Sequence, residues 1–108
     1  MEKKELYTDN EIKLAHFARS MGHPARASIL LAIATHGGEV DGKIVEVPAL
    51  SQATVIQHLR ELKRAGLITG RIFGAKAKYG IDWEAITSFN DNVSHFTEML
   101  RNGKENNV

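Results

Sequence analysis

One stretch near the middle of the chain has the clearest pattern of hydrophobic and polar positions. Val55, Leu59 and Leu62 recur at the i, i+4 and i+7 spacing of a buried helical face. Ser51 precedes this run and is a suitable N-cap residue. Gly66 follows it, at a place where a residue that tolerates positive φ is favoured. The pattern therefore predicts an amphipathic helix between Ser51 and Gly66.

The opposite flank of this predicted helix carries amide, hydroxyl and cationic groups. Such groups suit base edges and phosphate oxygens, so the flank is a candidate nucleic-acid surface. Its members are Gln52, Thr54, Gln57, Arg60, Lys63 and Arg64.

Two further helices are predicted before this element. Residues 1–7 are polar, and both they and residues 103–108 are expected to fray. Thr8 and Glu11 then have the spacing of a capping box and predict a helix over residues 8–21. A second helix is expected over residues 24–36, because it begins with a proline, whose fixed φ suits a first helical turn.

The period of the hydrophobic pattern changes after the predicted helix. Residues 67–73 and 78–82 are short β-prone stretches on either side of residues 74–77, which predicts a two-stranded hairpin with a cationic tip. Lysines on an exposed hairpin also protect its edges, so a DNA-contacting role and a protective role both remain open for them.

A last helix is predicted over residues 83–102. Its apolar residues alternate at separations of three and four, as in helices that pair lengthwise: Ile86, Phe89, Val93, Phe96 and Leu100. In a chain of 108 residues the expected partner is a second copy, bound through the helices over 8–21 and 83–102. The alternative is a monomer whose last helix covers its own core.

The net charge of +1 is unevenly distributed. Residues 57–78 carry a net charge of +5 and the rest of the chain carries −4, as expected of a nucleic-acid face on an acidic body. The alternative is a solvated basic helix. The absence of cysteine excludes disulfides and thiolate sensors. With no long apolar run or signal peptide, residues 1–108 are expected to form one cytoplasmic domain without a membrane partner.

The stretch Ser51-Gln-Ala-Thr-Val-Ile-Gln-His-Leu-Arg-Glu-Leu62, followed by Ala65-Gly-Leu-Ile68, resembles the recognition helix and wing entry of the ArsR family of winged helix-turn-helix repressors. The resemblance covers about residues 17–83 and includes the Gly22-His23-Pro24-x-Arg26 start of the second helix. It implies a mainly α fold with a small β-hairpin, with about five helices and a two-stranded wing. It also implies a homodimeric transcriptional repressor that binds a palindromic operator in double-stranded DNA.

Three features of the sequence bear on this resemblance. Residues 43–47 alternate and are β-branched, which favours a strand, whereas the resemblance implies a short helix. We expect the helix, because tertiary context often overrides the propensity of five residues. The resemblance implies that Arg26 braces the fold, and an exposed side chain is the alternative. Ile56 stands where the family usually has a small polar residue that faces DNA, so it is expected to contact a thymine methyl or to indicate a different site.

The predicted DNA contacts combine the polar flank with the resemblance. The residues expected in the major groove are Ser51, Gln52, Thr54, Ile56, Gln57 and His58. The residues expected on phosphates and on the wing are Arg60, Arg64, Arg71, Lys76 and Lys78. The predicted dimer interface consists of Ile12, Phe17, Ile86, Phe89, Val93, Phe96 and Leu100. The alternative function is that of a winged-helix protein-interaction module that binds no DNA.

Other chemistry finds little support. One metal site of the family has ligands at both ends of the last helix, and Asp82, Glu84, His95 and Glu98 match its spacing. Glu84 replaces the usual histidine, which weakens a preference for zinc, and charged residues on an outward face are usually only solvated. We therefore predict no metal site and no cofactor. Catalytic motifs are also missing from the sequence, so no enzyme activity is expected. The sequence does not specify an inducer.

Overall fold

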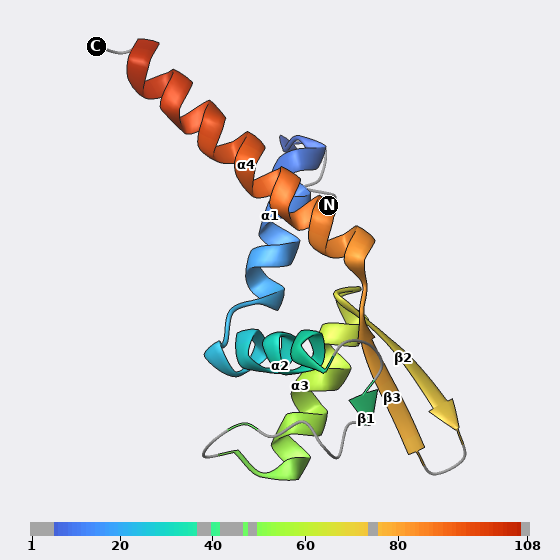
Figure 1. The fold of residues 1–108 in the computed structure, drawn as a ribbon. Coiled ribbons are helices and arrows are strands. Elements are labelled where there is room, and N and C mark those ends of the chain that lie inside the picture. Colours follow the sequence, from blue (N-terminus) through green and yellow to red (C-terminus); the bar gives the residue numbers. More distant parts are fainter. Residues whose placement is uncertain (1–5, 37–39, 42–46, 48–49, 74–75, 107–108) are drawn as a thin grey trace.

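The computed structural model describes residues 6–36, 40–41, 47, 50–73 and 76–106 (Figure 1). In chain order the elements are α1 (Asp9–Ser20), α2 (Pro24–Thr35), β1 (Val40–Asp41), α3 (Gln52–Arg64), β2 (Ile68–Phe73), β3 (Lys76–Ile81) and α4 (Trp83–Asn106). Within the described ranges, no helix is both long and apolar enough to cross a membrane.

The first two helices begin where the sequence indicates. The Thr8 hydroxyl accepts a hydrogen bond from the Glu11 backbone at 3.1 Å, and the Glu11 carboxylate accepts one from the Thr8 backbone at 2.8 Å, which confirms the capping box. Pro24 lies in the first turn of α2. The Nδ1 atom of His23 accepts a hydrogen bond from the Ala25 backbone at 3.0 Å and caps this helix.

The core lies where α2, α3 and the hairpin meet. Val55, Leu59 and Leu62 of α3 are 1%, 0% and 0% exposed, so the stripe predicted to be buried is buried. The stripe packs in one cluster with residues from the other elements. The remaining members of that cluster are Phe17, Ile29, Ile33, Leu67, Ile68 and Tyr79.

The sheet has three strands rather than the two that were predicted. Its order is β1-β3-β2 and both pairs are antiparallel. The additional strand arises because Val40 pairs with Tyr79, and Asp41 with Lys78. The hairpin strands begin and end within two residues of the predicted bounds.

The described part of the chain contains four helices, not about five. The fifth was the short helix predicted over residues 43–47, of which 43–46 lie outside the described residues. Val47, the remaining position, belongs to no helix or strand.

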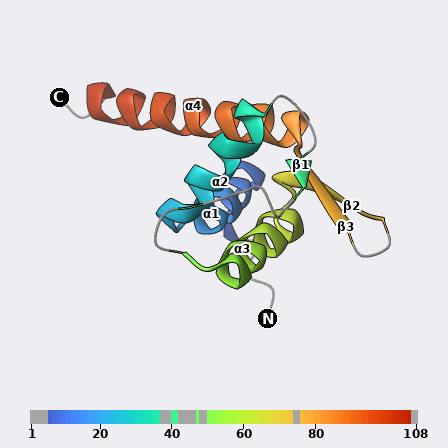
Figure 2. The same ribbon diagram turned by 60° about the horizontal axis from the view of Figure 1, so that its bottom comes forward.

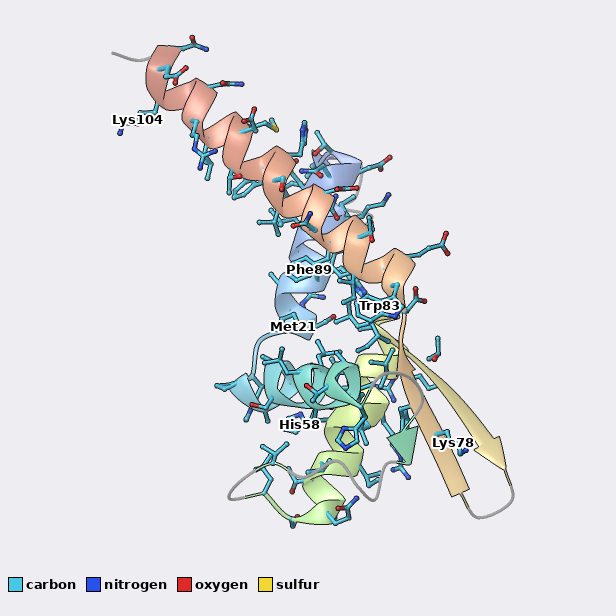
Figure 3. The ribbon with its side chains drawn as sticks, in the orientation of Figure 1. Met21, His58, Lys78, Trp83, Phe89 and Lys104 are labelled. Atoms are coloured by element: carbon cyan, nitrogen blue, oxygen red, sulfur yellow. The ribbon has the colours of Figure 1, made fainter. Side chains whose placement is uncertain are left out.

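Helix α4 projects beyond the rest of the molecule (Figure 1). It continues to Asn106, so residues 103–106, which were predicted to fray, are helical. The Asp82 carboxylate accepts a hydrogen bond from the Ala85 backbone at 3.1 Å and caps the first turn. The first half of α4 contacts the body, where the rings of Phe17 and Phe89 lie 5.2 Å apart. In Figure 3, Phe89 is directed from α4 toward α1.

Gly66 connects α3 to the hairpin in a conformation that favours glycine. Its φ is +86°, and the flanking Leu67 backbone donates to the Leu62 carbonyl at 3.1 Å, which ends the helix. A Cβ at Gly66 would meet no other atom within 4 Å, so the cost of Gly66→Ala comes from the backbone alone. We expect this change to lower the free energy of unfolding by about 1–2 kcal/mol in urea denaturation. Gly103→Ala, in the helical α4, is the control and is expected to be neutral or stabilising. An equal loss in both variants would contradict the explanation.

Candidate nucleic-acid interface

Helix α3 lies across one face of the molecule, with the hairpin projecting beside it and α4 on the opposite side (Figure 2). The Ser51 hydroxyl accepts from the Thr54 backbone at 3.2 Å and lies 3.0 Å from the Thr54 hydroxyl, which confirms Ser51 as the N-cap. Lys63 and Arg64 occupy the last turn, where cations interact favourably with the helix dipole.

The polar flank of α3 is open to solvent along its whole length. Its exposed residues are Ser51, Gln52, Thr54, Gln57, Arg60, Lys63 and Arg64. The Arg64 guanidinium donates to the Glu61 carboxylate at 3.1 Å, but the Arg64 side chain is still 76% exposed. A surface pair of this kind contributes little stability, so the guanidinium can turn to a phosphate at small cost. The flank therefore presents hydrogen-bonding groups and cations on a helix whose other side is fully buried.

Two of the predicted groove residues lie against the body instead. Ile56 is half-buried and packs on the core cluster, so its side chain contacts the chain's own core rather than the solvent-facing flank. His58 is also half-buried and is directed toward the start of α2. Both residues lie beside the buried stripe of α3, and the buried face of a helix is wide enough for such residues to contact neighbouring elements.

Arg26 connects three helices through its guanidinium. Its Nε donates to Nδ1 of His58 at 3.2 Å, and its Nη1 donates to the Ser20 carbonyl at 2.9 Å. These bonds confirm the prediction that Arg26 braces the fold. The His23 and His58 rings lie 4.7 Å apart at their centroids. Burial lowers the pKa of His58 below its usual range, and so does the proximity of His23 and Arg26, because their charged forms would repel an imidazolium at His58.

The hairpin contacts the end of α3 closely. A Cβ built on Gly70 would lie 3.0 Å from Cδ and 3.2 Å from Cε of Lys63, so the lysine stem crosses this strand at a glycine. Lys63 was part of the predicted polar flank but not of the predicted DNA contacts, and its position between helix and hairpin adds a cation to this face. Lys78 is exposed on β3 (Figure 3). The side chains of Arg71 and Lys76 lie outside the description.

The predicted dimer surface divides into a buried part and an exposed part. Phe17 is only 7% exposed, because its ring packs against Phe89 of the same chain, and this corrects its assignment to a partner contact. Ile12, Ile86 and Phe89 are half-buried. The exposed large apolar residues of the projecting part of α4 are Val93, Phe96, Met99 and Leu100.

A groove of about 880 Å³ runs along α1. Its lining includes Tyr7, Ile12 and Ala15 of the N-terminal segment and Ser88 of α4. Asn92 of α4 donates to the Asn10 side chain at 2.7 Å and holds the two helices together near this groove. Helices α1 and α4 are therefore held together, and residues of both line the groove.

The residues considered for a metal site are separated along α4. Asp82 caps the first turn of the helix, and the helical rise puts Glu84 and His95 roughly 16 Å apart. Across the described residues, no three histidine, aspartate or glutamate side chains are grouped so that they could hold a metal ion.

Comparison with known proteins agrees with this geometry. Residues 23–69 match the model of the bacterial regulatory protein family arsR. No curated protein sequence gave a significant match.

Several solved structures share the fold. An ArsR-like transcriptional regulator from Rhodococcus sp. RHA1 has a TM-score of 0.73 at 14% identity, over 91% of this chain and 92% of that chain. The transcriptional regulator HlyU from Vibrio vulnificus CMCP6 has a TM-score of 0.57 at 27% identity, over 81% and 91%. The transcriptional repressor BigR from Xylella fastidiosa has a TM-score of 0.62 at 19% identity, over 89% and 97%. The chain thus has the winged-helix fold of ArsR-like transcriptional regulators, and its residues 23–69 match the model of the arsR family.

Proposed function

We propose that this chain is a sequence-specific DNA-binding transcriptional regulator that represses from a palindromic operator as a homodimer. One observation carries the proposal: α3 is anchored by a fully buried stripe while its opposite flank exposes hydroxyl, amide and guanidinium groups. A rigid helix with such a flank fits the major groove, where these groups distinguish base pairs. The structurally similar BigR is a transcriptional repressor, and repression is proposed for this chain by that similarity. A regulator of this bacterial family would act in the cytoplasm, beside the chromosome.

Individual roles are proposed from the exposure of the described side chains and, for Arg71 and Lys76, from the sequence alone. Ser51, Gln52, Thr54 and Gln57 would read base edges. Arg60 and Arg64 would contact phosphates, and Lys78 would extend the contact along the wing together with Arg71 and Lys76. Ile56 and His58 are left to packing and positioning, because both lie against the body.

The dimer would form through α1 and the projecting part of α4. Burying the exposed apolar residues of α4 against a partner would remove their surface from water, which is favourable. The groove along α1 offers a partly apolar surface for a partner's helix. A two-fold axis between these surfaces would bring two α3 helices to successive major grooves, about 34 Å apart. An isologous dimer of this kind predicts an operator with two inverted half-sites.

A winged-helix protein-interaction module is the rival function, and salt separates the two. Binding to a mixed-sequence duplex should weaken linearly on a double logarithmic plot against salt concentration, because each phosphate contact releases condensed counterions. The slope, measured by fluorescence anisotropy, should indicate several contacts per dimer. Failure to bind duplex DNA at low salt would favour the interaction module.

Two alanine variants should separate phosphate contacts from base contacts. Lys78→Ala is expected to weaken binding to all sequences alike and to reduce the salt slope by about one. Thr54→Ala is expected to cost about 1–3 kcal/mol on the preferred sequence alone. Anisotropy titrations with one preferred and one random duplex give both quantities. An equal loss on the two duplexes for Thr54→Ala would argue against base reading by this residue.

A further inference from the structure

Three side chains meet where the first turn of α2 contacts α3: His23, Arg26 and His58. Figure 3 labels His58 on α3, near its crossing with α2. The ring of His58 accepts the Arg26 Nε hydrogen at 3.2 Å, and the ring of His23 accepts the Ala25 backbone hydrogen at 3.0 Å. The same guanidinium continues to the Ser20 carbonyl, so the cluster joins α3 to both preceding helices. Its side chains are not needed for any proposed DNA contact.

Both imidazoles use Nδ1 as a hydrogen-bond acceptor. A ring nitrogen can accept only when it carries no proton, so both rings must be neutral, with the proton on Nε2. Protonation would remove the acceptor for Arg26 and the N-cap of α2. It would also create two imidazolium ions, 4.7 Å apart at their centroids, beside a guanidinium and the positive end of a helix dipole.

Water can solvate a charged ring at the exposed His23, but the half-buried His58 has no carboxylate partner among the described residues. Helix α2 contributes His23 and Arg26 to the contact with His58. Helix α1 contacts the cluster through the Ser20 carbonyl. The residue before Ser20 is Arg19, which is another cation. On α3 itself, Glu61 lies one turn from His58, and its carboxylate accepts from Arg64. Throughout the ranges that the structure describes, no carboxylate forms an ion pair or hydrogen bond with any of the three side chains.

We propose that His23, Arg26 and His58 form an acid-sensitive joint, which seats the DNA-reading helix on α2 while both rings are neutral and loosens it when they take up protons. The proposal rests on the proposed function, because it concerns how the same helix is presented to DNA. Acidification would then reduce discrimination between operator and random DNA, since base contacts need a fixed helix whereas phosphate contacts need mainly charge.

The direction of the stability change follows from the lowered pKa of His58. As pH falls below about 6.5, the unfolded chain binds a proton at this residue before the folded chain does. The folded state is therefore fully stable above this range and loses stability as the pH decreases through it.

Asparagine variants provide the test, because the Asn Oδ1 takes the place of His Nδ1 as an acceptor and does not titrate. Asparagine also serves well as an N-cap at position 23. Between about pH 7.5 and about pH 5.5, the urea midpoint of the wild type should fall, and its preference for operator over random duplex should decrease on the order of tenfold. The double variant His23→Asn, His58→Asn should show neither change. His36→Asn is the matched control, since His36 bonds to the Ala32 carbonyl outside the cluster, and it should behave like the wild type.

An equal pH response in the double variant and the wild type would overturn the proposal, as would a wild type without any response. If the double variant does not fold, ¹⁵N NMR of the wild-type imidazoles decides, because both rings must show the Nε2-protonated neutral form near neutral pH, and an Nδ1 proton on His58 contradicts the joint. A chain that prefers no duplex at either pH would reject the proposed function, while the urea midpoints would still decide whether the joint exists.

Discussion

Replacing Leu100 by glutamate is expected to convert the proposed dimer to monomers and to abolish tight operator binding. Leu100 is 57% exposed in the single chain, so the change costs the fold of one protomer little. At a two-fold interface it would bury two carboxylates without partners. We expect the dimer dissociation constant to rise at least a hundredfold, which corresponds to about 3 kcal/mol. Sedimentation equilibrium measures this constant, and duplex titration measures the accompanying loss of affinity.

Asn102→Glu is the matched control for this prediction. Asn102 is exposed on the same helix but falls outside the repeating apolar positions of α4, and its substitution adds the same charge. Dimerisation and DNA binding should remain near wild-type values in this variant. If Leu100→Glu remains as dimeric as Asn102→Glu, the apolar residues of α4 do not form the interface.

Leu59→Ala and Gln57→Ala are expected to distinguish the structural role of the buried flank of α3 from the DNA-binding role of its exposed flank. Leu59 has no exposed surface, and its truncation leaves a cavity between α3 and the core. We expect a loss of about 2–5 kcal/mol in the free energy of unfolding, which is large for a domain of this size. Gln57 is exposed two residues earlier, and its truncation should change stability by less than about 0.5 kcal/mol.

The effects on DNA binding should follow the opposite order once both variants are compared under folding conditions. Gln57→Ala should lose about 1–3 kcal/mol of binding to the preferred sequence, because an amide that reads a base edge is removed. Urea denaturation and operator titration of the same two proteins provide the comparison. A Gln57→Ala protein that binds its operator normally would remove this residue from the proposed reading surface.

The sequence predicted those parts of the fold that local chemistry determines. Capping at Thr8 and Ser51, the proline at the start of α2 and the glycine after α3 each act on neighbouring backbone groups, so their signals are readable without the fold. The buried stripe of α3 was predicted for a similar reason, since one helical period identifies it.

The errors concern contacts between segments far apart in the chain. Strand β1 exists because two residues pair with β3, and two residues carry too little pattern to predict this. Phe17 is a large apolar residue of a kind that is common in interfaces. Only the position of α4 shows that Phe89 of the same chain packs against it. His58 was assigned to the major groove because its neighbours in the sequence are polar. In the structure its Nδ1 accepts a hydrogen bond from Arg26, so the ring lies against α2. The spacing of His23 and Arg26 at the start of α2 was visible, but the contact with His58, 32 positions after Arg26, was not.

The most direct measurement is a selection of bound duplexes from a random pool, made with the wild type and with a Thr54→Ala, Gln57→Ala double variant. If the exposed flank of α3 reads DNA, the wild type should enrich an inverted repeat with half-site centres about one helical turn apart, and the double variant should lose that preference at specific bases. No enriched sequence for the wild type, or the same sequence enriched equally by both proteins, would contradict this account.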